Sequence, residues 1–240
     1  MARIEREHWW FVAKRHILRS LIMAFVQGPP GTRPRVADIG CGTGALLEDL
    51  APNCDVVGLD SSETARHLCA AKGLRVLRCW LPADLPIDDG SFDAVVMSDV
   101  LEHVAEDGPA ARVAAGKLKP GGVLVVTVPA HPWMWTSHDD VHHHQRRYTK
   151  RGLASVLDET GLVRERLSYY NAGLFAPMMV ARMVGKWRGG GSRAGSGVPP
   201  WPVNAVLRGV FGCERHLLPR VPLPFGASLA AVYRKRDVGP

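Results

Sequence analysis

Apolar and polar residues alternate with two different periods along the chain. Apolar side chains recur at helical spacing between Glu5 and Gln27, which predicts one long amphipathic helix. From residue 35 onward, short β-branched runs alternate with helical segments, as in βαβ units with a mostly parallel, doubly wound sheet. The predicted strands are 35–39, 55–60, 74–79, 92–98 and 122–129, and the predicted helices between them are 44–51, 61–73 and 106–119.

This regular alternation stops after Pro129. A polar segment rich in histidine and aromatic residues, 130–148, is followed by further predicted elements. These are helices at 149–161, 173–187 and 203–218, and strands at 162–170 and 228–236. The glycine- and serine-rich stretch 188–200 predicts a flexible loop and not a domain boundary.

The length of 240 residues suits one domain. We expect its parts to be an N-terminal lid helix (1–28), a cofactor-binding core (34–129), an acceptor-site cap (130–225) and a final strand (226–236). Five scattered cysteines without a CxxC pair indicate a reducing compartment, and hence the cytoplasm. The formal charge of +7 comes without interleaved aromatics, so we expect no nucleic-acid partner. No apolar stretch reaches the length of a membrane span.

Three glycines follow the first predicted strand at alternate positions. Gly40, Gly42 and Gly44 stand between a strand and a helix, where glycine permits a tight turn and close approach of a ligand to the backbone. Asp60 ends the second strand, 22 residues after Asp38, where a carboxylate accepts hydrogen bonds from ribose hydroxyls. Together these features predict a cofactor of the nucleoside type.

Four successive motifs resemble those of one known protein family. The sequences VADIGCGTG, VVGLDSS, LPIDDGSFDAVVMSDVLEHV and LKPGGVLVVTVP, between Arg35 and Pro129, resemble the motifs of class I S-adenosylmethionine-dependent methyltransferases in order and spacing. The resemblance implies a Rossmann-like, seven-stranded sheet that is parallel except for the final strand. It also implies S-adenosylmethionine as the cofactor.

The resemblance also implies which residues bind the cofactor. Many relatives have an acidic residue where this chain has Leu81, so the adenine would instead meet backbone groups or the apolar faces of Trp80 and Leu81. The N-terminal helix resembles a lid over the cofactor, with Lys14 or Arg15 reaching the methionine carboxylate. The implied cofactor residues are Trp10, Arg15, Asp38, Gly40, Cys41, Gly42, Gly44, Asp60, Ser61, Leu81, Ser98, Asp99 and His103.

Purely structural interpretations of some of these residues stay open. Glu102 and His103 can be ordinary surface residues at the point where a strand ends and a helix cap begins. For Cys41, packing as a small residue in the loop is a better interpretation than a reactive thiol. The aromatic residues of the N-terminal helix can simply pack against the sheet. Because the helix is basic and aromatic, it can also bind at a membrane surface.

The segment 131–148 leaves the end of the fifth strand, where open α/β sheets place their ligand crevice. Its sequence SHDDVHHHQRRYT resembles a subgroup of uncharacterised bacterial methyltransferases with an HD and then an HxRRY pattern. The sequences HWWFVAKR and LPFGASLAAVYRK resemble that subgroup as well. We therefore expect the acceptor site here.

Candidate roles follow from the chemistry of these side chains. His138 or His144 titrates in the range of a general base, and Asp139 can orient an imidazole. Arg146 or Arg147 can clamp a carboxylate or phosphate, unless it is a structural ion pair. The remaining candidates are Tyr148 in the catalytic group and His131, Trp133 and Trp135 as substrate-binding residues. Such a cluster of His and Asp can hold a divalent ion that orients a substrate diol, but this one lacks a fixed ligand spacing, so no metal site is expected.

The expected function is S-adenosylmethionine-dependent O- or C-methylation of a small molecule that is anionic or partly apolar. The acceptor would be phosphorylated, phenolic or lipid-linked, and the oligomeric state is left open. One rival is an enzyme of this fold that binds the cofactor without transferring methyl, such as a cyclase or decarboxylase. Another rival is an accessory protein with a degenerate pocket.

Overall fold

The computed structural model describes residues 2–28, 31–180 and 197–237. Seven strands form one sheet in the order β3-β2-β1-β4-β5-β7-β6. Only β7 runs antiparallel to its neighbours, so the predicted α/β fold with one antiparallel final strand is confirmed. The strands are β1 (Arg35–Ile39), β2 (Asp55–Asp60), β3 (Val76–Arg78), β4 (Phe92–Ser98), β5 (Leu118–Pro129), β6 (Val163–Tyr170) and β7 (Ser228–Arg234).

The central strands are buried on both faces, and their side chains alternate between two apolar layers. In β4, Ala94 and Val96 face one layer, whereas Val95 and Met97 face the other. This two-fold period is what a pleated strand imposes on a continuous apolar run. The core therefore lies on both sides of β1, β4 and β5.

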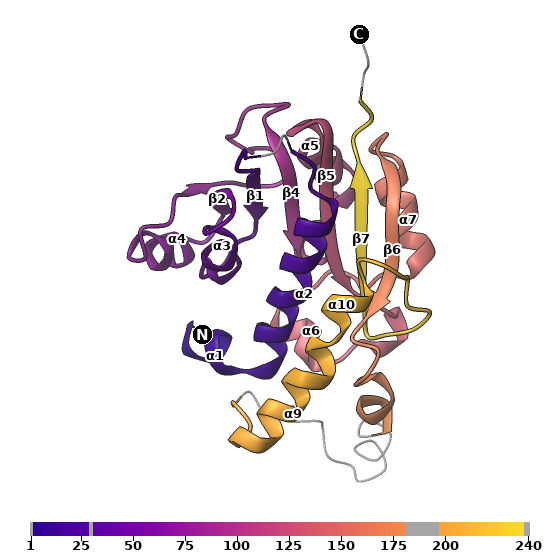
Figure 1. The fold of residues 1–240 in the computed structure, drawn as a ribbon. Coiled ribbons are helices and arrows are strands. Elements are labelled where there is room, and N and C mark those ends of the chain that lie inside the picture. The colour runs from indigo at the N-terminus through magenta and orange to yellow at the C-terminus, as the bar shows by residue number, and fades with distance from the viewer. Residues whose placement is uncertain (1, 29–30, 181–196, 238–240) are drawn as a thin grey trace.

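Helices cover both faces of this sheet (Figure 1). One face packs against α2 (Trp9–Phe25), α3 (Ala45–Leu50), α9 (Trp201–Gly212) and α10 (Glu214–Leu217). The other face packs against α5 (Asp107–Gly116) and α7 (Lys150–Asp158). Helix α4 (Glu63–Ala70) contributes Cys69 to a small apolar cluster with α3. In the part of the chain that the structure describes, no helix is long and apolar enough to cross a bilayer.

The N-terminal helix differs from its prediction because it is broken. His8 adopts an extended backbone and caps α2 by accepting a hydrogen bond from the Trp10 amide, which separates α2 from α1 (Ala2–Glu7). The Trp9 amide donates to Asn204 at 2.8 Å and the Trp10 amide to the His8 ring, so the helical bonds are interrupted at these two residues. Apolar spacing alone did not reveal this break.

Other boundaries also moved, most of them by one to four residues. The helix expected to reach Lys119 ends at Gly116, because Leu118 already pairs with Phe92 as the start of β5. The expected helix 203–218 begins at Trp201 and is interrupted at Cys213. Residues 175–180 are helical as expected, whereas most of the predicted loop at 188–200 lies outside the described residues.

Short elements lie at the carboxyl ends of the central strands. Turn η1 (Leu101–His103) follows β4, while η2 (Pro132–Met134) and α6 (Ser137–Val141) follow β5. Helix α1 reaches the same edge of the sheet, near the bottom of Figure 1. This edge therefore brings the glycine loop, the N-terminal helices and the histidine-rich segment into one region.

Candidate functional site

The glycine loop between β1 and α3 folds back onto the end of β2. Amides of Gly40 and Cys41 donate to the Leu59 carbonyl, at 2.7 and 3.2 Å. The Gly42 amide donates to the Asp60 carboxylate at 2.8 Å, and the Ser62 amide donates to its other oxygen at 2.8 Å. Loop and carboxylate are thus one hydrogen-bonded unit at the strand ends.

The glycines of this loop serve two different purposes. Gly40, Gly42 and Gly44 all have positive φ angles, of 73°, 55° and 79°, which residues with a side chain rarely adopt. A Cβ atom on Gly40 would lie 2.5 Å from Val100, but a Cβ on Gly42 would meet nothing within 4 Å. The space beside Gly42 is therefore open to a ligand that approaches the backbone.

Carboxylates surround a single buried lysine beside this loop. Lys14 on α2 is 7% exposed and forms an ion pair with Asp99. Burial raises the pKa of Asp38 to about 7, although the charge of Lys14 opposes the rise and the charge of Asp60 adds to it. A region with more carboxylates than cations favours a ligand that carries positive charge.

Asp99 is fixed at the end of β4 from several directions. Its φ angle of 54° turns the chain sharply after the strand. Its carboxylate accepts from the Thr127 hydroxyl at 3.1 Å as well as from Lys14, and the Ser98 hydroxyl lies 3.2 Å from that of Thr127. The two predicted pocket residues, Ser98 and Asp99, thus share one hydrogen-bond network at the strand ends.

The two predicted lid residues differ in their surroundings. Trp10 presents its ring to Lys14, whose ammonium lies 5.0 Å from the ring centroid. Arg15 instead binds Asp49 of α3 at 3.1 Å and the Glu5 carbonyl at 2.7 Å. Of the two cations proposed to reach a methionine carboxylate, Lys14 lies in the acidic region and Arg15 is held by α3 and α1.

Other predicted cofactor residues occupy varied positions. Cys41 is buried, and burial strongly raises the pKa of its thiol, so it packs and does not present a thiolate. Ser61 is exposed and its carbonyl accepts from Arg66. Leu81 is half-buried against the core, and the neighbouring Trp80 is exposed, which leaves apolar surface where the adenine is expected.

Two segments far apart in sequence are joined at this edge. The Gln145 amide donates to the Glu102 carbonyl at 2.7 Å, and its side chain donates to the His103 carbonyl at 3.1 Å. Arg146 reaches the Ala105 carbonyl at 2.9 Å. We call residues 101–107 and 144–148 together the clasp, because these bonds hold the loop after β5 against the turn after β4.

Arg146 and Tyr148 both bind Asp107 within the clasp. Arg146 forms an ion pair with Asp107 at 2.8 Å, and the buried Tyr148 hydroxyl donates to the same carboxylate at 2.7 Å. Burial and this hydrogen bond raise the pKa of Tyr148 far above its usual range. The placement of Tyr148 in the interior gives it a structural task instead of the predicted catalytic one.

Asp139 organises the residues around it from a fully buried position. It accepts from Arg147 at 2.7 and 3.0 Å, and from Nδ1 of His144 at 2.8 Å. Burial raises the pKa of Asp139, but hydrogen bonds from Arg147 and His144 outweigh burial and bring it to about 2. Asp139 orients His144 as expected, and Arg147 forms a buried ion pair with Asp139.

Of the other predicted acceptor residues, His131 belongs to a cluster of aromatic rings. The ring of His131 stacks on Tyr169, with centroids 5.2 Å apart, and its Nε2 lies 2.9 Å from the Gly226 carbonyl. Trp133 is 63% exposed, and Trp135 donates from its indole nitrogen to Asp140 at 2.9 Å. His138 lies in α6, and its side chain is outside what the structure describes.

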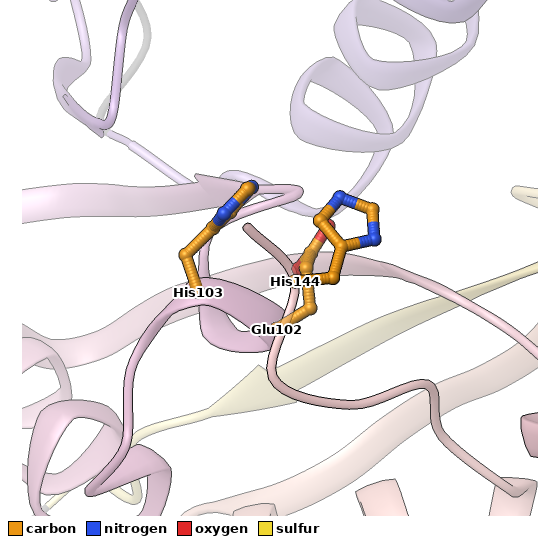
Figure 2. A group of neighbouring side chains, drawn as sticks. All are labelled: Glu102, His103 and His144. Carbon is orange, nitrogen blue, oxygen red and sulfur yellow. The ribbon is translucent and has the colours of Figure 1, made fainter. Parts of the chain in front are cut away.

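Glu102 is the site residue that sequence reasoning missed. The interpretation of Glu102 as a surface residue is wrong, because its side chain is 0% exposed. Ligand atoms of Glu102, His103 and His144 all lie within 4.8 Å of one another. In Figure 2 these three side chains gather at one place, from η1 and from the loop after α6. We call them the Glu-His group.

Comparisons with known proteins agree with this geometry. Residues 37–126 match the family described as a methyltransferase domain. A ubiquinone biosynthesis O-methyltransferase of Methylococcus capsulatus is 34% identical over 128 residues, which cover 48% of this chain and 54% of that relative. The chain thus spans about half the length of this curated relative.

Solved structures with the same fold are more distant in sequence. A methyltransferase of Archaeoglobus fulgidus matches with a TM-score of 0.60 and 20% identity, covering 98% of both chains. The cyclase SpnF matches with a TM-score of 0.60 and 22% identity, covering 95% of this chain and 83% of that one. These likenesses establish the fold and leave the reaction open.

The fold and the strand-end site define the Rossmann-like class of proteins that bind a nucleoside cofactor. Within that class, residues 37–126 match the methyltransferase domain family. S-adenosylmethionine is the cofactor that this match and the fold indicate. The open space beside Gly42 and the carboxylates around Lys14 suit a ligand with a sulfonium and an ammonium group.

Proposed function

We propose that this protein transfers a methyl group from S-adenosylmethionine to an oxygen atom of a small acceptor. The observation that carries the proposal is the position of the Glu-His group directly beside the acidic cofactor region. Asp99, which pairs with Lys14, acts electrostatically on both Glu102 and His103. Groups able to bind a hydroxyl therefore adjoin the expected methyl donor.

The residues of the glycine loop and the strand ends would bind the cofactor. Asp60 would accept hydrogen bonds from the ribose, and Asp38 with Lys14 would bind the charged methionine end. S-adenosylmethionine, when bound, supplies an electrophilic methyl group and leaves as a neutral thioether once the new oxygen–carbon bond has formed. Lys14 and Asp99 would align that end relative to the Glu-His group, because alignment dominates an in-line displacement.

The Glu-His group would receive the acceptor. Burial and the neighbouring His144 lower the pKa of His103, so its ring is neutral at pH 7 and offers a lone pair. The acceptor hydroxyl would lose its proton at this group, which replaces the single histidine base of the sequence-based hypothesis. No arginine clamp is included, because Arg146 and Arg147 are paired with Asp107 and Asp139.

The acceptor we favour is a small molecule with an acidic hydroxyl, such as a phenol. The named O-methyltransferase relative supports oxygen over carbon as the methylated atom. Exposed Trp133 and Trp135 near the same strand ends suit an aromatic or lipid-linked acceptor. We also retain, as part of the proposal, membership in the subgroup that shares the HD and HxRRY patterns, because the HxRRY residues lie in the clasp and Asp139 of the HD pattern binds His144 and Arg147.

The decisive experiment uses cofactor labelled in its methyl group. The full chain is incubated with labelled S-adenosylmethionine and a panel of phenolic, phosphorylated and lipid-linked acceptors, and products are analysed by mass spectrometry. We expect label in a phenolic product. A reaction that consumes the acceptor without incorporating label would favour the cyclase or decarboxylase alternative and overturn methyl transfer.

Calorimetric titration with the demethylated cofactor product tests the pocket itself. Asp60→Ala should weaken binding by about 1 to 3 kcal/mol, since a hydrogen-bonded carboxylate is lost. Asp55→Ala is the matched control, because Asp55 begins the same strand at its opposite end. Failure of the unaltered protein to bind the product would support the accessory-protein alternative instead.

A further inference from the structure

The Glu-His group contains a carboxylate that nothing in the described structure satisfies. Both side-chain oxygens of Glu102 are buried, and neither has a hydrogen-bond partner among the described residues. Burying a carboxylate without a partner costs several kcal/mol unless it is neutralised or bound by a cation. Lys14 and Arg147 act on Glu102 electrostatically, but they bind Asp99 and Asp139.

His144 is held as histidine ligands of metal ions commonly are. Its Nδ1 faces the Asp139 carboxylate at 2.8 Å, and a carboxylate can only accept, so Nδ1 carries the proton. Nε2 is then the nitrogen left to bind a metal ion. Arg147 and Thr136 in turn fix Asp139. A metal-binding histidine typically donates its other ring proton to a carboxylate in this way.

His103 completes the set from the neighbouring position on η1. Its ring lies edge-on to that of His144, with centroids 4.7 Å apart. Among the described residues no hydrogen bond joins the two imidazole rings, and each ring has a nitrogen within 4.8 Å of a Glu102 oxygen. A shared cation is the partner that satisfies two lone pairs and a carboxylate at once.

We propose that Glu102, His103 and His144 bind one divalent transition-metal ion, of which Zn²⁺ is the best match. Two imidazoles and one carboxylate form a zinc site that keeps a coordination position open. Mg²⁺ and Ca²⁺ prefer oxygen ligands alone, so they fit less well. The clasp builds the site, because its bonds bring His144 beside residues 102 and 103.

The task of the ion rests on the proposed function. The open coordination position would bind the oxygen of the acceptor hydroxyl, and the ion would lower the pKa of that hydroxyl. The proton leaves to solvent, and the oxygen keeps the electron pair that forms the new bond to the methyl carbon. In this form of the proposal, the metal ion bound by the Glu-His group promotes the loss of the proton from the acceptor hydroxyl.

Binding of Co²⁺ tests the site without relying on activity. The EDTA-treated full chain is titrated with Co²⁺ and followed by visible absorption, then Zn²⁺ is added in competition. We expect one Co²⁺ per chain, displaced by Zn²⁺. Glu102→Gln, His103→Ala and His144→Ala should each abolish this binding, whereas His67→Ala, an exposed histidine on α4, should leave it unchanged.

A positioning variant sharpens the test. Asp139→Asn keeps the shape of the side chain but weakens the orientation of His144, so we expect the cobalt dissociation constant to rise about 10- to 100-fold. Thermal melting of each variant checks that it folds. Cobalt that binds equally well to Glu102→Gln and the unaltered protein would overturn the proposal.

The same samples separate this proposal from the proposed function. Affinity for the demethylated cofactor product is measured in Glu102→Gln and His144→Ala, and we expect it to stay within about threefold, because neither residue is among those assigned to the cofactor. A protein that binds the cofactor product but no cobalt refutes the metal site alone. A protein that binds cobalt but methylates nothing refutes the proposed function alone.

Discussion

The glycine loop and the clasp form neighbouring parts of one crevice but depend on different kinds of contact. In the loop, the Gly42 amide meets Asp60, which is 18 positions away within one βαβ unit. In the clasp, the main bonds join residues 41 to 43 positions apart that belong to different connections. A local unit has a recognisable sequence spacing, whereas contacts between two loops have none.

The two regions also respond differently to charge. The glycine loop stands over an acidic region in which Lys14 is the buried cation. In the clasp, in contrast, both arginines are held in ion pairs, Arg146 with Asp107 and Arg147 with the neighbouring Asp139. This difference predicts that changes in the clasp alter stability first, and that changes at the loop alter cofactor binding first.

The largest effect is expected at the centre of the acceptor region. Asp139→Ala leaves Arg147 buried without its partner, which should lower the free energy of unfolding by about 3 to 5 kcal/mol. Urea denaturation measures the loss. Asp140→Ala, the exposed neighbour, should cost less than about 1 kcal/mol. A similar loss in both variants would contradict the role of Asp139 as organiser.

A pair of glycine variants separates folding from binding within the loop. Gly40→Ala should destabilise the protein by about 2 to 4 kcal/mol, because the new Cβ combines a positive φ with a clash against Val100. Gly42→Ala should cost only about 1 to 2 kcal/mol, from the positive φ alone.

Calorimetric titration completes this comparison. Gly42→Ala should lose most of its affinity for the demethylated cofactor product, since the new methyl group occupies the open space beside the loop. Unchanged affinity in Gly42→Ala would show that the cofactor lies elsewhere.

A smaller effect is expected from the clasp hydroxyl. Tyr148→Phe removes the donor to Asp107 and should cost about 1 to 2 kcal/mol in unfolding free energy. Cofactor affinity should not change, because the hydroxyl faces away from the glycine loop toward α5. Tyr169→Phe is the control, and urea denaturation should leave its stability within about 0.5 kcal/mol of the unaltered protein.

The smallest effect concerns pH at the loop. Asp38 has a pKa of about 7, raised by burial against the opposing charge of Lys14 and reinforced by Asp60 and Glu5. Because the ionised carboxylate should bind the cationic methionine end, affinity should rise about eightfold between pH 6 and 7.5, following the ionised fraction. Asp38→Asn should remove this component of the pH profile.

The stability of the fold should change with pH in the opposite direction to the cofactor affinity. A carboxyl whose pKa is higher in the folded state stabilises the fold below its unfolded pKa and loses that contribution as the pH rises through 7. The ligand-free protein should therefore lose stability over this range relative to Asp38→Asn. Denaturation curves at pH 5 and 8 that shift equally for both proteins would contradict the shifted pKa.

Much of the fold followed from local patterns. Continuous apolar runs such as that of β4 predict strands buried on both faces, and the glycine loop with Asp60 marks the cofactor end of the sheet. The break at His8 did not follow, because the apolar spacing of the N-terminal segment continues through it. A cap depends on backbone angles that periodicity does not record.

The sequence by itself determined the alternating strands and helices, the glycine loop and the carboxylate that follows β2, since each depends on residues close together in the chain. Only the tertiary structure decided that Glu102 is buried, that Lys14 pairs with Asp99, and that His144 lies beside His103. These contacts join separate connections, whose relative positions depend on the packing of the whole sheet and on the clasp. Long-range packing leaves no spacing rule in the sequence, so the chemistry of the acceptor side emerged only in three dimensions.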